Sequence, residues 1–332
     1  MPSESLPKTM RAIVVAEDSG QTTLKEANVD VPRPGEGQIL IKVEAAGINR
    51  TDLRREQSHF KVSGPIVAGL EVAGEICEVG SGVTEFSVGD RVAAMAPGGY
   101  AEYAVADEIS TLALPDGVSS VDGAALATWY MTAHNALVSA GQFKKGDTVL
   151  VTAATSGIGM SVLQVARALG ASKVIGSCRN PAKQDAFKAL GWDALIGSSP
   201  DEIQDGVDKE TENTGVDVVI DMVGAGLINA LIQSTSIGGH IVSVGRLAGF
   251  DDQIDLDKLA LRRVSLVGVT FRTRSREEKR AVRDDMMRDL KEPLMSGKIK
   301  PIVDSTFPLE MALAAQEYMA ENRHLGKVVL TV

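Results

Sequence analysis

The most constraining feature of the sequence is a segment in which an apolar run enters a turn of small residues and continues as a helical pattern. The run 148–152 is typical of a buried strand, and residues 158–169 have the spacing of a helix. Small residues in the intervening turn let a pyrophosphate approach the backbone and the free amides of a helix N-terminus. The pattern therefore predicts a dinucleotide-binding turn, and the residues that we assign to cofactor binding there are Ala154, Ser156, Gly157, Ile158 and Gly159.

The segments around this turn support that interpretation over a plain strand-to-helix turn. Strand and helix patterns alternate from residue 148 to residue 244, with strands expected at 173–177, 216–221 and 240–244. Such alternation predicts a doubly wound parallel sheet, the Rossmann arrangement of an α/β fold. We expect this domain to span residues 122–257.

The first third of the chain has a different pattern. Short apolar runs between residues 10 and 115 are separated by Pro-Gly and Gly-Asp turns. This pattern indicates a mainly β, partly open barrel. We expect a catalytic domain over residues 1–121, completed by residues 258–332, with the active site between the two domains.

Composition excludes several classes of function. A net charge of -10 disfavours binding to nucleic acid or to anionic membranes. Two cysteines cannot build a disulfide framework, no apolar run is long enough to span a membrane, and the N-terminus lacks the pattern of a signal peptide. We therefore expect a soluble, cytoplasmic protein with a small-molecule partner.

The strand expected at 173–177 carries the signal for cofactor preference. NAD-preferring proteins place a carboxylate near its end, whereas this chain continues as Ser177-Cys178-Arg179. Arg179, with Lys183 one turn later, could pair with a 2′-phosphate, which favours NADPH. The alternative is that both are ordinary solvated charges at a helix start. Ser177, Arg179 and Lys183 are assigned to cofactor binding.

Seven segments in order resemble the zinc-free quinone oxidoreductases, the zeta-crystallin-like branch of the medium-chain dehydrogenase/reductase superfamily. The resemblance implies a GroES-like catalytic domain, and a homodimer or homotetramer joined along Rossmann edge strands. The matching segments are 45–53 (AAGINRTDL), 69–74 (GLEVAG), 99–103 (GYAEY), 149–159, 221–224 (DMVG), 272–275 (RTRS) and 324–330 (HLGKVVL).

The same segments depart from the zinc-dependent relatives. Those proteins carry a Cys-His-Thr-Asp run and a Gly-His-Glu triplet, where this chain has Asn49 at the cysteine position and Leu70 at the second histidine position. An amide and a leucine cannot supply the ligands that zinc requires, so we expect no metal. Asp52 and Glu71 remain from this neighbourhood, either as catalytic groups or as hydrogen-bond partners of the backbone or Arg50.

The resemblance also implies roles for individual residues near the substrate. Asn49 would face the nicotinamide and orient the substrate, and Phe60 would line the substrate site where close relatives often have tyrosine. Tyr130 could then act as a substitute proton donor, and packing between domains is the alternative interpretation. Arg272 would place a cation at the substrate. The remaining cofactor contacts implied are Thr132, Val223, Gly245 and Lys327.

Together these features predict an NADPH-dependent reductase that transfers hydride to a quinone or another activated α,β-unsaturated carbonyl without zinc. Two alternatives remain open. One is an enone or enoyl alkene reductase of a biosynthetic pathway, and the other is a low-turnover, crystallin-like NADPH-binding protein.

Overall fold

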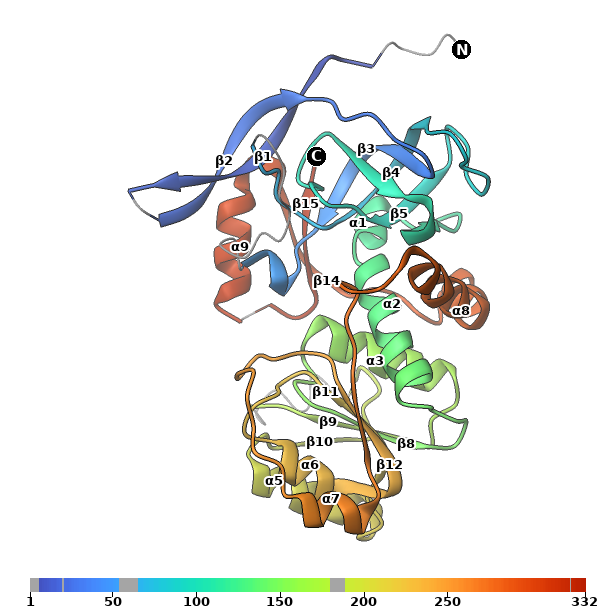
Figure 1. The fold of residues 1–332 in the computed structure, drawn as a ribbon, viewed down its shortest axis with the longest axis vertical. Helices are drawn as coiled ribbons and strands as arrows, with labels where there is room; N and C mark the ends of the chain where they lie inside the picture. Colours follow the sequence, from blue (N-terminus) through green and yellow to red (C-terminus); the bar gives the residue numbers. More distant parts are fainter. Residues whose placement is uncertain (1–5, 20, 54–64, 180–188, 323) are drawn as a thin grey trace. The chain divides into compact units, whose positions relative to one another are not determined.

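The computed structural model describes residues 6–19, 21–53, 65–179, 189–322 and 324–332 (Figure 1). The chain forms two compact units. Unit 1 comprises Met1–Thr128 and Lys300–Val332, and unit 2 comprises Trp129–Ile299. The fold is mixed α/β, with an open, mainly β unit and a parallel-sheet unit, which confirms the expected fold class.

Unit 1 is built mainly from antiparallel strands. Its open sheet has the order β14-β15-β3-β4-β5-β7, with β6 also paired to β3, and β1 and β2 form a separate two-stranded sheet. The elements are β1 (Thr9–Asp18), β2 (Gln21–Asp30), β3 (Gln38–Gly47), η1 (Arg50–Leu53), β4 (Glu71–Val79), β5 (Arg91–Met95), β6 (Tyr103–Asp107), η3 (Glu108–Ser110), β7 (Thr111–Ala113), α1 (Ser120–Gly123), β14 (Val303–Pro308), η6 (Leu309–Met311), α9 (Ala312–Ala320) and β15 (Lys327–Thr331).

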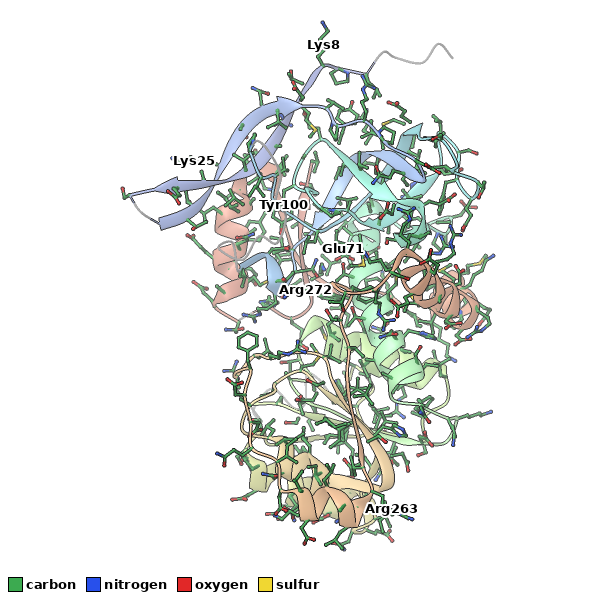
Figure 2. All side chains as sticks on the ribbon, in the orientation of Figure 1. Lys8, Lys25, Glu71, Tyr100, Arg263 and Arg272 are labelled. Atoms are coloured by element: carbon green, nitrogen blue, oxygen red, sulfur yellow. The ribbon has the colours of Figure 1, made fainter. Side chains whose placement is uncertain are left out.

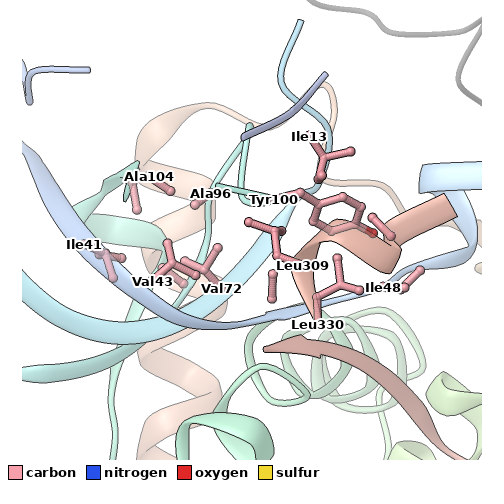
Figure 3. Close-up of a cluster of buried hydrophobic side chains, with 14 of the residues drawn as sticks. Ile13, Ile41, Val43, Ile48, Val72, Ala96, Tyr100, Ala104, Leu309 and Leu330 are labelled. Carbon is pink, nitrogen blue, oxygen red and sulfur yellow. The ribbon is translucent and has the colours of Figure 1, made fainter. Parts of the chain in front are cut away.

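The core of unit 1 joins segments from both ends of the chain. β15 pairs with β3 in antiparallel register, with Val329 opposite Gly47. Figure 3 shows the Tyr100 ring within an apolar cluster that includes Ile48 from the first half of the chain and Leu330 from β15. This packing explains why the C-terminal residues belong to the same unit as the N-terminal ones.

Unit 2 contains a six-stranded parallel sheet with the order β10-β9-β8-β11-β12-β13. The strand order reverses its direction of growth between β8 and β11, which is the switch point where ligands bind in such sheets. The elements are α2 (Ala127–His134, which begins in unit 1), the π-helix η4 (Asn135–Ala140), β8 (Thr148–Val151), α3 (Gly157–Ala168), β9 (Lys173–Ser177), β10 (Ala194–Ile196), α5 (Pro200–Thr211), β11 (Val216–Asp221), α6 (Ile228–Ser234), β12 (Thr235–Ser243), α7 (Leu256–Arg262), β13 (Ser265–Gly268) and α8 (Arg276–Met295).

Helices cover both faces of this sheet. α5, α6 and α7 pack together on one face, while α3 contacts β8 and β9 from the other (Figure 1). Local sequence begins these helices at defined residues. For α5, the N-cap Ser199 and Glu202 form a capping box, which satisfies amides that the first turn leaves unpaired, and Pro200 occupies the first helical position.

The bounds of the units differ from the expected domains at two places. Residues 258–299 were expected with the catalytic domain, but they belong to unit 2 because β13 extends the parallel sheet beyond β12 and α8 contacts α3. Residues 122–128 were expected in the Rossmann domain and belong to unit 1.

Candidate active site

The turn between β8 and α3 has the geometry of an anion site. Ser156 is the N-cap of α3, and its Oγ accepts a hydrogen bond from the Gly159 amide at 3.1 Å. Among the described residues, the amides of Gly157 and Ile158 find no acceptor. Two unpaired amides at the positive end of a helix suit the oxygens of a pyrophosphate.

Small residues are required at this turn by what surrounds them. A Cβ on Gly157 would lie 1.9 Å from the Trp129 ring, and one on Gly159 would lie 2.8 Å from the Ala154 carbonyl oxygen. Ala153 has a positive φ of 47°, and the Ala154 amide donates to the Ser177 carbonyl of β9. The turn is thereby held against the neighbouring strand.

A buried carboxylate organises the adjacent strand end. Asp221, the last residue of β11, accepts hydrogen bonds from Thr152 Oγ1 at 2.7 Å and from the amides of Val223 and Gly224 at 3.0 Å. Burial raises the pKa of Asp221 above its usual range, although these donors oppose the shift. A Cβ on Gly245 would lie 2.3 Å from the Met222 carbonyl oxygen, so the turn after β12 also needs glycine.

The residues expected to bind the ribose and 2′-phosphate of the cofactor lie at and after the end of β9. Ser177 is buried and its Oγ donates to the Gly197 carbonyl at 3.0 Å, so this hydroxyl is already engaged. Arg179 is exposed and lies two residues beyond the end of β9. Lys183, the second predicted cation, lies outside the described residues.

Helix α2 holds the two residues predicted beside the nicotinamide. Thr132 is partly buried, and Tyr130 is fully buried with its hydroxyl donating to Gln164 Oε1 at 3.0 Å. Burial raises the pKa of Tyr130 far above its usual value. A phenol with so high a pKa that is already engaged with Gln164 is a poor proton donor.

Unit 1 places a buried polar cluster around Asn49 that the sequence did not reveal. Lys327 Nζ donates to Glu71 Oε2 at 2.6 Å and to Asn49 Oδ1 at 2.8 Å. The Asn49 amide nitrogen donates to Glu71 Oε2 at 3.1 Å and to the Gly47 carbonyl at 3.3 Å. Both charged side chains are wholly inaccessible to solvent. Burial lowers the pKa of Lys327, and Glu71 opposes that shift.

Asp52 lies next to this cluster, on the short helix η1. Its Oδ2 accepts hydrogen bonds from the backbone amide of Asn49 and from the Tyr100 hydroxyl, each at 2.8 Å. Burial raises the pKa of Asp52 to about 6, against the influence of these two donors. Burial and Asp52 also raise the pKa of Tyr100 well above its usual value. Figure 2 shows Tyr100 and Glu71 within unit 1.

The predicted site residues thus fall into separate groups. Lys327 was assigned to the cofactor, and the structure places its ammonium against Asn49 and Glu71. Arg272 is exposed in the segment between β13 and α8 (Figure 2), and Phe60 lies outside the described residues. Among the residues that the structure describes, no group of three or more His, Cys, Asp or Glu is arranged to hold a metal ion.

Comparisons with known proteins match both units. Residues 35–116 match the family described as alcohol dehydrogenase GroES-like domain, and residues 157–286 match the zinc-binding dehydrogenase family. The quinone oxidoreductase of Rattus norvegicus is 32% identical over 329 residues, which cover 97% of this chain and 98% of the relative.

Solved structures give the same result. The native structure of a mycobacterial quinone oxidoreductase superposes with a TM-score of 0.85 at 32% identity, covering 97% of this chain and 100% of the other. A mycobacterial protein complexed with NADPH superposes with a TM-score of 0.82, also at 32% identity, with 97% and 100% covered.

A GroES-like unit and a doubly wound unit in one chain define the medium-chain dehydrogenase/reductase class. Within that superfamily the chain belongs to the quinone oxidoreductase branch, and it is an oxidoreductase. No helix in the described part of the chain combines the length and apolar character needed to cross a membrane.

Proposed function

We propose that this protein is an NADPH-dependent, zinc-independent reductase that transfers hydride to a quinone or another activated α,β-unsaturated carbonyl. The observation that carries the proposal is the similarity to quinone oxidoreductases over nearly the whole length of both chains. Neither Cys77 nor Cys178 is part of a disulfide, which is in keeping with a reducing compartment such as the cytoplasm.

The N-terminus of α3 fits the pyrophosphate of a dinucleotide. The unpaired amides of Gly157 and Ile158 would bind its oxygens, and the Asp221 contacts hold the backbone of residues 222–224 in place. Arg179, exposed at the end of β9, would pair with the 2′-phosphate of NADPH. The cofactor, when bound, supplies the hydride.

The buried ammonium of Lys327 supports catalysis without zinc. It lies 2.8 Å from the oxygen of Asn49, the residue that stands where zinc-dependent relatives have a cysteine. A divalent cation there would be repelled by this charge, and Glu71 already pairs with the ammonium at 2.6 Å. An amide in place of a thiolate weakens any remaining affinity for zinc.

These contacts also define what Asn49 can do for a substrate. Its amide nitrogen is engaged with Glu71 and Gly47, and one lone pair of Oδ1 accepts from Lys327. The second lone pair of Oδ1 remains, since an amide oxygen accepts two hydrogen bonds. Asn49 would therefore accept a hydrogen bond from the hydroxyl of a reduced acceptor, in an orientation that Lys327 fixes.

We also propose that two copies associate along β13. This strand ends the six-stranded sheet, and its outer edge has no strand partner among the residues that the structure describes. Leu266 on β13 and Leu256 and Leu261 on α7 are exposed, with 43%, 72% and 71% of their surface accessible. An unpaired edge strand that carries an exposed leucine is a surface that a second copy would cover.

The direct test is oxidation of NADPH and NADH with a panel of quinones and enones in the presence of a zinc chelator. We expect chelator-resistant turnover that prefers NADPH. Arg179→Ala should lose that preference, whereas Lys298→Ala, which removes another exposed cation, should keep it. Chelator-sensitive alcohol oxidation or an NADH preference would contradict the proposal.

Product analysis separates this function from the two alternatives. A quinol identifies the quinone reductase, and a saturated ketone identifies the alkene reductase. NADPH binding without turnover on either panel identifies the low-turnover, crystallin-like protein.

A further inference from the structure

Only one of the two carboxyl oxygens of Asp52 accepts hydrogen bonds from the described residues. Oδ2 accepts a hydrogen bond from the backbone amide of Asn49 and another from the Tyr100 hydroxyl, each at 2.8 Å. Oδ1 accepts no hydrogen bond from any residue in the described part of the chain. The side chain is only partly buried, and it is three residues from Asn49 on the same turn. An oriented carboxyl oxygen therefore remains available beside the residue expected to meet the substrate.

The groups around Asp52 keep it titratable near neutrality. Burial raises its pKa to about 6 and Glu71 adds to the rise, while the Asn49 backbone amide, the Tyr100 hydroxyl and Lys327 oppose it. At pH 7 a carboxyl with that pKa is protonated in roughly a tenth of the molecules, and an ordinary aspartate in fewer than about one in a thousand. A fraction of the Asp52 carboxyl groups therefore stays protonated at neutral pH, where an exposed aspartate would be almost fully ionised.

We propose that Asp52 is a catalytic residue that donates, from Oδ1, the proton required by the reduced acceptor. The proposal rests on the reductase function proposed above. It supplies the donor that Tyr130 does not, because the Tyr130 hydroxyl is fully buried and engaged with Gln164.

The acceptor gains two electrons and one hydrogen as hydride from the dihydronicotinamide, which is oxidised, and it becomes a quinol monoanion or an enolate. The O–H bond of Asp52 breaks, and a new O–H bond forms on the anionic oxygen of the acceptor. The Asp52 carboxylate then takes a proton from water before the next turnover.

Tyr100 is the positioning residue for this proton transfer. Its ring is fixed in the apolar core of unit 1 (Figure 3), and its hydroxyl holds Oδ2 so that Oδ1 stays open. Gln316 of α9 donates to the Asp52 backbone carbonyl at 3.4 Å and restrains the same turn. Neither side chain is required to touch the substrate.

The test is the pH dependence of kcat with a quinone. The wild type should lose activity as the pH rises through an apparent pKa near 6, because the Asp52 carboxyl is then deprotonated and has no proton to donate. Asp52→Asn should lower kcat by about 10²- to 10⁴-fold and abolish that decline. Its NADPH dissociation constant, measured by fluorescence, should be unchanged, and Asp116→Asn, at an exposed acid of unit 1, should leave both measurements unchanged.

Tyr100→Phe provides a second readout. It removes a hydrogen bond that favours the carboxylate, so the decline should move up by roughly one to two pH units while the low-pH plateau remains. A protonated-carboxyl infrared band, present in the wild type at pH 5 and missing in Asp52→Asn, would show the same group titrating without turnover.

Three outcomes separate this inference from the function on which it rests. An Asp52→Asn enzyme that keeps the decline near pH 6 overturns Asp52 as the donor, even if quinone reduction is confirmed. Reduction of enones alone overturns the quinone substrate, while the same pH test still applies to the enolate. If the protonated-carboxyl band titrates with a midpoint near pH 4, the raised pKa of Asp52 is overturned directly.

Discussion

Replacing Lys327 by methionine tests whether the buried ion pair organises unit 1. The Nζ atom lies 2.6 Å from Glu71 Oε2 and 2.8 Å from Asn49 Oδ1, and neither charged side chain reaches solvent. Methionine nearly preserves the volume but leaves the Glu71 carboxylate buried without its counter-ion. Removing one partner of a buried pair costs about 3–5 kcal/mol of unfolding free energy.

The expected consequence is a fall in Tm of roughly 10 °C. Circular dichroism during thermal unfolding measures it, with Lys298→Met as the matched control at an exposed lysine, where a change within about 0.5 kcal/mol is expected. The double variant Lys327→Met/Glu71→Gln should recover at least half of the loss, because it removes the uncompensated charge. A double variant no more stable than Lys327→Met would refute the reasoning and assign the loss to packing.

Two further predictions concern the cofactor turn and the sheet edge. Gly157→Ala, whose new Cβ would meet the Trp129 ring at 1.9 Å, should weaken NADPH binding at least about tenfold by fluorescence titration. Gly268→Ala, which meets nothing within 4 Å, should not, and equal affinities would contradict the steric argument. Leu266→Lys should shift the protein towards the monomer in analytical ultracentrifugation, and an unchanged sedimentation profile would count against association along β13.

The dinucleotide turn could be predicted because its signals are local. Helix α3 occupies 157–168 where the sequence indicated 158–169, and α8 ends at residue 295 where the sequence indicated 296. Small residues, an N-cap serine and helical periodicity all lie within a few turns of the chain. The strand β2 was missed because the segment 21–30 is largely polar, and its partner β1 supplies the pairing.

The polar cluster of unit 1 could not be predicted for the opposite reason. Lys327 is 256 positions from Glu71 and 278 from Asn49, and the pairing of β15 with β3 brings them together. The contact between Tyr100 and Asp52 also joins separate segments. The sequence singled out Asn49 and Asp52 as candidates, whereas their hydrogen-bond partners depend on tertiary contacts that periodicity does not encode.

The lysine variant also bears on the proton donor, because the charges of the cluster act on Asp52 in opposite directions. Lys327 lowers the pKa of Asp52 and Glu71 raises it. Removing the ammonium alone should therefore raise the pKa of Asp52 above about 6, and the decline in kcat should move to higher pH.

The double variant removes both influences, so its decline should return towards that of the wild type. A Lys327→Met enzyme whose pH profile stays in place while its stability falls would separate the two roles. In that case the ion pair would stabilise unit 1 without setting the protonation of Asp52, and the pKa of the donor would be controlled by burial, the Asn49 backbone amide and the Tyr100 hydroxyl.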